Sequence, residues 1–338
     1  MRAAFYCAPE CIEVRHVSAV HVADGDVLID VEACGVCGSD VASFAYGHYV
    51  EAGQVMGHEV CGLVADVGSA LAGISIGDRV VVRPMRSCGT CAYCIDGQTH
   101  LCAGTAGRSL GYGLPGGYAD QVLVTDAVIG LDVRVVPLHL EPQNAMWAEP
   151  LAVAIHAVGI CGVGPAEPMV VIGGGSVGLC VAAAGLSINT GRVTVVEPRA
   201  DRRAAAARLG AETADGSTDT PYRDAAHVID ASGSVRALTE AMAAMRAGGK
   251  MVLVGLGDAY VPWSSGRVDL VGSFAYTDVD FARSVDLLVA EDVQLGELVT
   301  HVFALDDTAL AIAASRGDPT VVKAAVIPIR PRSLEKNT

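Results

Sequence analysis

The stretch Val170-Val171-Ile172-Gly173-Gly174-Gly175-Ser176-Val177-Gly178 decides the fold of this chain. An apolar strand runs into three consecutive glycines, and a further glycine follows in the first turn of a predicted helix. The first glycine permits a tight turn, the third lets the backbone approach a pyrophosphate, and the last lets the helix pack against the sheet. N–H groups at the start of the helix then face the phosphates. The pattern predicts a dinucleotide site at Gly173, Gly175, Ser176, Val177 and Gly178, with a glycine turn that only packs and binds no ligand as the alternative.

Strands and helices alternate from Pro168 onward, which indicates a parallel sheet wound by βαβ units. The predicted strands cover 170–172, 193–196, 228–230 and 251–254, and the predicted helices cover 176–186, 201–209 and 234–245. A six-stranded doubly wound sheet needs two more strands, for which 270–274 and 299–303 are the candidates. Only a polar stretch, 212–223, separates the second helix from the third strand.

Short β-rich runs punctuated by glycine fill the first part of the chain, at 27–33, 60–67, 79–83 and 120–124. Tight-turn signals lie beside them, at Gly77-Asp78 and Leu114-Pro-Gly-Gly. The pattern of this half therefore predicts a compact β barrel with loops. The pattern of the whole chain predicts an α/β protein. With 338 residues, two domains with separate cores are expected. The polar tail 330–338 is expected to fray.

Charge and cysteine usage restrict the classes of function. The formal net charge of −15 gives an acidic surface that repels phosphate backbones and anionic headgroups, so nucleic acid and membranes are not expected partners. No apolar stretch reaches the roughly 18 residues that span a bilayer, and no export signal is seen, so a cytoplasmic location is expected. Eleven cysteines in such a chain are expected to be metal ligands and core thiols rather than disulfides.

Four cysteines, Cys88, Cys91, Cys94 and Cys102, follow a C-x2-C-x2-C-x7-C spacing. Zinc prefers four sulfur ligands in a closed shell, and short spacers let one turn bring several thiolates onto one ion. Four unrelated buried cysteines are the alternative. The spacing predicts a structural zinc site.

A carboxylate at the end of the second predicted strand bears on the choice of cofactor. Glu197 lies 19 residues after Gly178, where it can accept hydrogen bonds from the adenosine ribose and repel a 2′-phosphate. This favours NAD over NADP. Arg199, Arg202 and Arg203 oppose that preference because they can attract a phosphate, and Arg202 is a predicted cofactor contact.

Three further segments contain possible metal ligands, Cys37, His58 and Glu149, and each is unconvincing alone. Taken with the cysteine lobe and the glycine turn, the order of motifs resembles the zinc-dependent medium-chain dehydrogenase/reductase family, in its polyol and threonine dehydrogenase-like branch. The matching motifs outside the lobe and the turn are Val36-Cys-Gly-Ser-Asp, Gly57-His-Glu, Gly77-Asp-Arg-Val, Gly116-Gly-Tyr-Ala, Glu149-Pro-Leu, Leu298-Val-Thr-His and Val322-Lys323.

The resemblance implies a GroES-like catalytic domain (1–150 and 293–338) and a Rossmann NAD-binding domain (151–292), with two zinc ions per subunit and a homodimer or homotetramer. It implies that Cys37, His58 and a carboxylate, Glu149 or Glu59, hold a catalytic zinc, with Asp40 orienting His58. Lys323 matches a basic contact to the cofactor pyrophosphate. Ser39 matches the hydroxyl that passes on the substrate proton, whereas Ala42 stands where many relatives have a relay histidine.

The implied activity is hydride transfer between NAD and a secondary alcohol of a polyol, sugar, cyclitol or amino alcohol. Zinc lowers the pKa of the hydroxyl, and the carbon that bears it passes hydride to the nicotinamide. One alternative is a biosynthetic reductase of a ketone, imine or conjugated double bond. Another is a nonenzymatic cofactor-binding or redox-sensing protein that uses zinc only for folding. The chain departs from the family in two places: relatives usually have a helix where this chain has only the polar stretch 212–223, so the adenosine side of the parallel sheet is expected to be trimmed, and the loop 258–266 is short.

Overall fold

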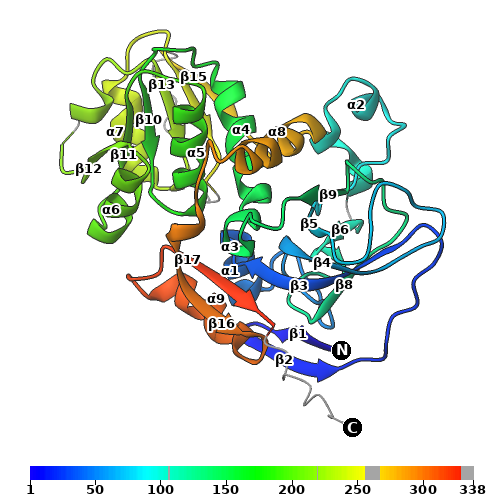
Figure 1. The fold of residues 1–338 in the computed structure, drawn as a ribbon. Helices are drawn as coiled ribbons and strands as arrows, with labels where there is room; N and C mark the ends of the chain where they lie inside the picture. The colour runs from blue at the N-terminus through cyan, green and yellow to red at the C-terminus, as the bar shows by residue number, and fades with distance from the viewer. Residues whose placement is uncertain (106, 219, 256–266, 329–338) are drawn as a thin grey trace.

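A computed structural model describes the chain except residues 106, 219, 256–266 and 329–338. The predicted fraying tail and the loop 258–266 therefore lie outside the described residues. Two large sheets organise the molecule, one in each half, and two long helices lie between them (Figure 1). None of the helices in the described part is long and apolar enough to cross a membrane.

The parallel sheet has six strands in the order β12-β11-β10-β13-β14-β15, and every neighbouring pair is parallel. Its strands are β10 (Met169–Ile172), β11 (Val193–Val196), β12 (Glu212–Ala214), β13 (His227–Asp230), β14 (Lys250–Leu253) and β15 (Asp269–Gly272). The doubly wound sheet predicted from the sequence is confirmed.

Two assignments inside that sheet need correction. The polar stretch 212–223 supplies the outer strand β12, whose residues are exposed or half-buried; an edge strand needs no apolar run, so its sequence gave no signal. The candidate 299–303 is instead β16 (Val299–Ala304) of the other sheet, where it pairs with β17 (Lys323–Ile327).

Helices cover the faces of the parallel sheet. They are α5 (Ser176–Ser187), α6 (Ala200–Arg208) and α7 (Val235–Ala244) as predicted to within two residues, and α4 (Ala148–Cys161) and α8 (Asp278–Val289), which were not predicted. Ser234 caps α7, and Thr277 and Asp280 form a capping box on α8. Both caps satisfy N–H groups that the first turn leaves unpaired.

The mixed sheet has the strand order β16-β17-β3-β4-β5-β9, and β8 also pairs with β3. Its strands are β3 (Val27–Gly35), β4 (Glu59–Val67), β5 (Arg79–Val82), β8 (Gln121–Val124), β9 (Val133–Val136) and the C-terminal β16 and β17. The hairpin of β1 (Arg2–Ala8) and β2 (Cys11–His16) and the short pair β6 (Ser109–Leu110) and β7 (Gly113–Leu114) lie outside it. The C-terminal segment thus completes a sheet that begins near the N-terminus (Figure 1).

Helix α4 joins the two halves through one apolar core. Side chains of β3, β4 and β5 pack in the same cluster as α4 and the central strands β10, β13 and β14. The remaining helices are α1 (Gly38–Tyr46), α2 (Ala92–Ile95), α3 (Pro142–Ala145) and α9 (Thr308–Gly317), with short 3-10 turns at Thr99–Leu101, Ala103–Thr105, Thr220–Tyr222, Gly296–Leu298 and Leu305–Asp307. The shared core fixes the two sheets, and the residues between them, relative to each other.

Candidate active site

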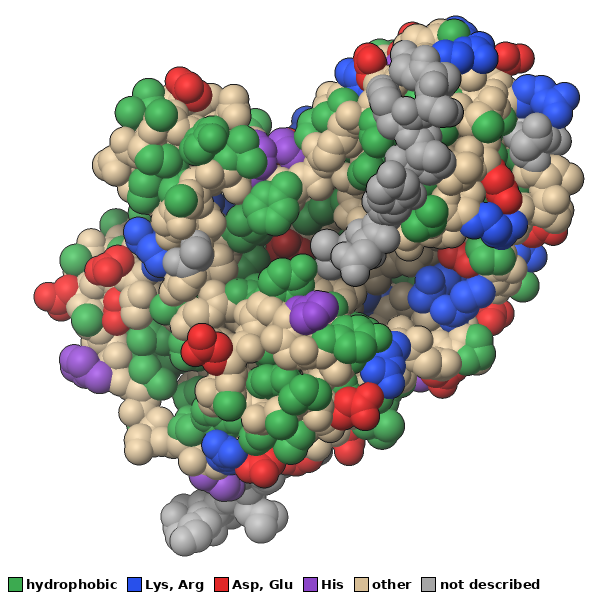
Figure 2. Space-filling view, turned by 180° about the vertical axis from the view of Figure 1, so that it is seen from behind, with side chains coloured by type: hydrophobic (Ala, Val, Ile, Leu, Met, Phe, Trp, Pro, Cys, Tyr) green, Lys and Arg blue, Asp and Glu red, His purple; other side chains and the backbone are tan. Residues whose placement is uncertain are grey.

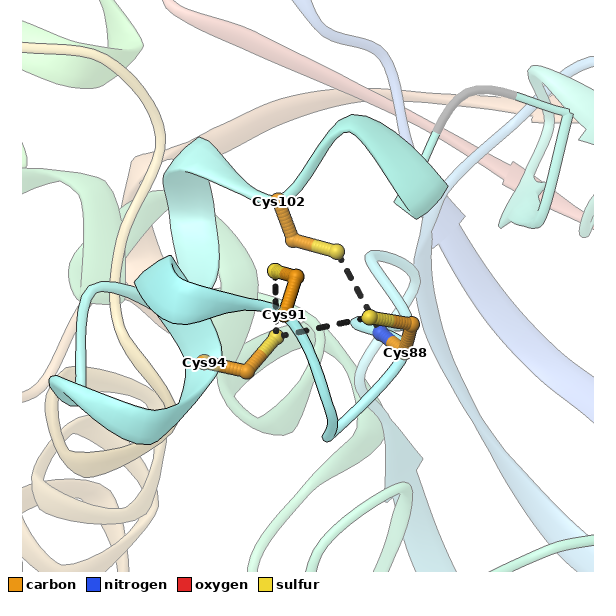
Figure 3. Close-up of side chains that lie close together, drawn as sticks. All are labelled: Cys88, Cys91, Cys94 and Cys102. Carbon is orange, nitrogen blue, oxygen red and sulfur yellow. Dashed lines mark hydrogen bonds between the residues drawn. The ribbon is translucent and has the colours of Figure 1, made fainter.

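The four lobe cysteines converge on one point (Figure 3). Their sulfurs all lie within 4.8 Å of one another, with 3.5 Å between the sulfurs of Cys91 and Cys94 and 3.9 Å between those of Cys88 and Cys94. A tetrahedral zinc with Zn–S bonds of about 2.3 Å requires sulfur separations of about 3.8 Å. The lobe therefore has the dimensions of a four-thiolate zinc site, and all four thiols are free of disulfides.

Two of the four lobe cysteines, Cys88 and Cys102, have donors that stabilise a thiolate before any metal binds. Hydrogen bonds from the backbone N–H and the hydroxyl of Thr90 lower the pKa of Cys88 to about 5. The backbone N–H groups of Cys88 and Gly104 each donate to Cys102 Sγ at 3.3 Å. Such donors compensate negative charge on sulfur, which a metal ligand requires.

A second group of metal-ligating atoms lies where β3, α1 and β4 meet. Cys37 is the N-cap of α1, and His58 and Glu59 lie where the chain enters β4. One ligand atom from each of these residues lies within 4.8 Å of the others; His58 and Glu59 are buried and Cys37 is half-buried. In the described part of the chain, buried polar atoms without a hydrogen-bond partner include His58 Nδ1 and both carboxylate oxygens of Glu59. A soft thiolate, an imidazole and a carboxylate are the donors zinc accepts, so this set fits a catalytic ion.

Asp40 supports this cluster from within α1. Its carboxylate accepts from the Cys37 backbone N–H at 2.9 Å and from the Tyr118 hydroxyl at 2.9 Å, and Oδ1 lies 3.6 Å from His58 Nδ1. Burial alone would raise the pKa of Asp40, but His58 and these hydrogen bonds outweigh it and hold the pKa below its usual value. A permanent carboxylate at this place favours the His58 tautomer that keeps Nε2 free for a metal.

Glu59 has a buried cationic partner. Lys323 Nζ lies 2.5 Å from Glu59 Oε2, both side chains are fully buried, and the ammonium lies 4.8 Å from the centre of the Trp147 ring. Gly35 makes room for the pair, because a Cβ on Gly35 would overlap Glu59 Oε2 and press on the Lys323 side chain. The cation–π contact and the ion pair together compensate the buried ammonium.

Glu149 approaches the same cluster from the first turn of α4. It is 8% exposed, and burial raises its pKa to about 7, against the opposing effect of His58. Glu59 raises the pKa further. A buried carboxyl that senses both His58 and Glu59 is therefore adjacent to the ligand cluster, although Glu59, not Glu149, completes the compact set with Cys37.

Ser39 follows Cys37 by two residues and is half-buried in the first turn of α1. The hydroxyl of Tyr112 donates to Ser39 Oγ at 2.7 Å, and the Tyr112 ring lies 5.2 Å from the His58 ring, centre to centre. Since Ser39 Oγ accepts from Tyr112, its own hydrogen is free to donate elsewhere.

The glycine turn has the shape that its sequence predicts. Gly173 has φ of 97°, which only glycine adopts without strain, and a Cβ on Gly178 would overlap the Gly173 carbonyl. Glu197 accepts from the Gly174 N–H at 2.8 Å and the Arg199 N–H at 2.9 Å. Arg202 Nη1 lies 4.0 Å from Glu197 Oε2. Gly175 is the N-cap of α5, so Ser176 and Val177 begin the helix whose N–H groups face this turn.

The surface between the two halves is hollowed, and acidic atoms are visible at the floor of the hollow (Figure 2). Two family models match the chain on either side of it. Residues 23–132 match an alcohol dehydrogenase GroES-like domain, and residues 176–290 match a zinc-binding dehydrogenase domain. D-xylulose reductase A of Aspergillus niger is 30% identical over 88% of this chain and 89% of its own length. The chain belongs to the zinc-dependent medium-chain dehydrogenase superfamily.

Other relatives also match this dehydrogenase over nearly the whole length of both chains. The 2-dehydro-3-deoxy-L-galactonate 5-dehydrogenase of Pseudoalteromonas atlantica is 29% identical over 96% of this chain and 98% of its own. Among solved structures, a zinc-binding dehydrogenase from Sinorhizobium meliloti bound to NADP superposes with a TM-score of 0.87, at 28% identity over 97% of this chain and 99% of its own. The alcohol dehydrogenase from Thermus sp. ATN1 gives 0.86, at 26% identity over 97% and 100%. The protein is thus an oxidoreductase of the alcohol dehydrogenase type that uses zinc and a nicotinamide cofactor.

The structure gives one predicted residue of this dehydrogenase an unexpected partner. Lys323, expected at the cofactor pyrophosphate, is fully buried against Glu59 and Trp147. Sequence reasoning missed Tyr112 and Trp147, and it assigned no role to Tyr118. No spacing signal marks them, because they reach the site through the fold: Tyr118 lies in the Gly116-Gly-Tyr-Ala motif, and Trp147 directly precedes α4.

Proposed function

We propose that this dehydrogenase transfers hydride between NAD and a secondary alcohol of a polyol, sugar, cyclitol or amino alcohol, and reduces the corresponding carbonyl in reverse. Relatives named for a sugar acid, for sorbitol and for D-xylulose support this substrate class. The observation that carries the proposal is the compact group of Cys37, His58 and Glu59, in which one ligand atom from each residue lies within 4.8 Å of the others.

Cys37 and His58 would hold the catalytic zinc with one carboxylate, Glu59 or Glu149. When bound, zinc acts as a Lewis acid on the substrate oxygen and lowers the pKa of the hydroxyl. Glu59 already has Lys323 as a cation, whereas Glu149 lies buried with a raised pKa of about 7 that burial causes. We therefore favour Glu149 as the third ligand and Glu59 as the carboxylate that exchanges with it. Asp40 fixes the orientation of His58.

Ser39 Oγ would accept the proton of the substrate hydroxyl and pass a proton onward. Tyr112 donates to one lone pair of that oxygen at 2.7 Å, which leaves the second lone pair for the substrate hydroxyl and the Ser39 hydrogen for an acceptor further along the relay. Ala42 offers no group for a relay histidine's role, so the proton leaves through hydroxyl groups and water.

The cofactor would lie on the glycine turn, with its pyrophosphate at the N-terminus of α5. Glu197 holds the turn through Gly174 and keeps lone pairs for the ribose hydroxyls. Its negative charge disfavours a 2′-phosphate, and Arg203 and Arg199 are occupied by backbone carbonyls, so NAD is the proposed cofactor. Arg202, beside Gly175 and Glu197, would contact the cofactor at the same edge.

We propose a catalytic domain of residues 1–150 and 293–338 and a cofactor-binding domain of residues 151–292. We also propose two zinc ions per subunit and a homodimer or homotetramer. β15 ends the parallel sheet, and Phe274 just beyond it is 63% exposed, which makes this edge the proposed subunit contact. Eleven free thiols support the proposed cytoplasmic location.

A substrate and cofactor matrix tests the proposal. We expect turnover with NAD and at least one secondary polyol or sugar alcohol, slower turnover with NADP, and reduction of the matching ketone with NADH. Activity confined to imines or conjugated double bonds would overturn the assignment. Metal analysis should give two zinc equivalents per chain, one of which is lost in Cys37→Ser.

A further inference from the structure

A third group of thiols lies outside both zinc-type sites, on the β1–β2 hairpin. The sulfurs of Cys7 and Cys11 and a carboxylate oxygen of Glu13 lie within 4.8 Å of one another. Both cysteines are half-buried, and only Ala8, Pro9 and Glu10 separate them at the hairpin turn. Cys11 pairs with Ala8, and the strand register shifts between Tyr6 and Ala8, so Cys7 lies in the irregular part of β1.

All eleven cysteines lie in the described part of the chain, so their surroundings can be compared. Five are buried: Cys34, Cys61, Cys102, Cys161 and Cys180. Cys37 and the three accessible lobe cysteines belong to the proposed zinc sites. Cys7 and Cys11 are the remaining pair, and they are both accessible and close.

A cation does not suit this pair. Arg15 Nη2 donates to Cys7 Sγ at 3.3 Å and to Glu13 at 2.7 Å, and the Arg15 guanidinium also lies 5.3 Å from the centre of the Phe5 ring. A metal ion among these three ligand atoms would face that guanidinium at short range. The same guanidinium compensates a thiolate, so the surroundings favour thiol chemistry over metal binding.

We propose that Cys7 and Cys11 are a redox-active pair that closes to a disulfide on reaction with a low-molecular-weight disulfide. One thiolate attacks a sulfur of the reagent, forms a mixed disulfide and releases the first reagent thiolate. The second protein thiolate attacks the bound protein sulfur, forms the Cys7–Cys11 bond and releases the second reagent thiolate. Two protein thiols are oxidised, one reagent disulfide is reduced to two thiols, and the two protons are transferred to those thiols.

The short distance between the two sulfurs favours the second step, the attack of the second protein thiolate on the mixed disulfide, over reversal of the first. A disulfide requires sulfurs about 2.05 Å apart and Cβ atoms about 3.8 Å apart, and sulfurs already within 4.8 Å approach by side-chain rotation. Glu10 at the turn has φ of 62° and donates its N–H to the Phe44 carbonyl at 2.7 Å, so the turn is held in place while the pair closes. Transient, reversible disulfides of this kind are the form in which disulfides occur in reducing compartments.

Two charged neighbours set the rate in opposite directions. The pKa of Cys7 is raised overall, by partial burial and by Glu13, against the opposing effect of Arg15. Removing the Glu13 charge, which leaves the tryptic sites unchanged, should therefore speed the oxidation severalfold. Glu10→Gln is the matched control, because Glu10 is an exposed acid on the same hairpin that pairs with Arg316 instead.

The experiment uses the zinc-loaded full chain and glutathione disulfide as the reagent. After remaining thiols are blocked, trypsin releases residues 3–15 as one peptide, cut after Arg2 and after Arg15, that contains both cysteines. We expect this peptide to become lighter by two hydrogen atoms and to revert with dithiothreitol. In Cys7→Ser and Cys11→Ser the peptide should instead retain one glutathione.

Three results would overturn the proposal. The first is an unmodified peptide in the folded chain. The second is a wild-type peptide that stops at the glutathione adduct. The third is stoichiometric zinc retained at this hairpin and lost in both serine variants. Neither cysteine belongs to the proposed catalytic or cofactor site, so the result is independent of the proposed function.

Discussion

The cysteine lobe and the Cys37 cluster are two ways of building a zinc-type site in one chain. The lobe draws its four ligands from fifteen consecutive residues, 88–102, and holds them in a mostly exposed loop. The cluster draws its ligands from the boundary of β3 and α1 and from the start of β4, and it is buried with Asp40, Glu59, Glu149 and Lys323. The lobe is therefore a local structure, whereas the cluster depends on the whole fold and carries buried charge.

The two designs should fail differently. A local, closed shell serves stability, because the ion replaces a core that the loop lacks. A buried cluster of several charges costs free energy to assemble. Such clusters occur mainly at sites where the charges take part in chemistry. The variants below separate the two cases.

Cys37→Ser should have the largest effect of these variants, and the effect should be on activity and not on stability. Losing several kcal/mol of transition-state stabilisation corresponds to a fall in kcat/KM of about 10³-fold or more. The melting temperature should change little, because Cys37 is half-buried and the lobe is unaffected. Steady-state kinetics and calorimetry check both parts. A large fall in melting temperature with equal loss of activity would show that the cluster is structural, like the lobe.

Lys323→Met should have the largest effect on stability. It leaves the Glu59 carboxylate buried without its cation, which costs about 3–5 kcal/mol. The double variant Glu59→Gln/Lys323→Met should recover part of that loss, since no uncompensated charge remains. Denaturant unfolding of both variants gives the comparison. Lys250→Met is the matched control, because Lys250 is half-buried and donates to a carbonyl, that of Ile160, rather than to a carboxylate. Equal losses in Lys323→Met and the control would contradict the ion-pair account.

Cys94→Ser should act mainly on stability, in contrast to Cys37→Ser. Breaking the lobe's closed shell should destabilise the chain by about 2 kcal/mol or more. Most activity should survive at low temperature, because no lobe atom belongs to the cluster. Cys11→Ser removes a thiol of similar accessibility outside the lobe and serves as the control. Thermal unfolding, zinc content and activity at low temperature form the measurement; loss of activity without loss of stability would be the opposite result.

The same contrast explains what the sequence predicted. The lobe is encoded in the spacing of four residues, and the glycine turn in the sequence between a strand and a helix, so both were predicted from local pattern alone. Cys37, His58 and Glu149 were convincing only through the order of motifs along the chain. Lys323 meets Glu59 through the pairing of β17 with β3, and it meets the Trp147 ring at the start of α4; no single-sequence period records such long-range register. β12 was missed for a related reason, because a polar edge strand has no apolar period.

The smallest effect is expected at the contact between the lobe and the helices α4 and α8 of the parallel-sheet half. Thr99 Oγ1 donates to Asp278 at 2.9 Å, and His100 lies against His156, whose Nδ1 is 2.8 Å from Asp280. Burial alone would raise the pKa of Asp280, but hydrogen bonds from His156 and Thr277 outweigh it and lower the pKa. A carboxyl with a lowered folded-state pKa adds stability above its unfolded value of about 3.9, and that stability is lost as pH falls through the folded value.

Asp280→Asn retains an oxygen that can cap α8 and removes only the charge, so it should cost about 1 kcal/mol at neutral pH. The difference in unfolding free energy between variant and wild type should shrink as pH falls below about 4, where wild-type Asp280 also becomes neutral. Taking the difference at each pH cancels zinc loss common to both proteins. Asp286→Asn, in the same helix but with an exposed side chain paired to Arg134, is the control. A difference that stays constant down to low pH would show that the contact of Asp280 with His156, against which His100 of the lobe lies, depends on shape and not on charge.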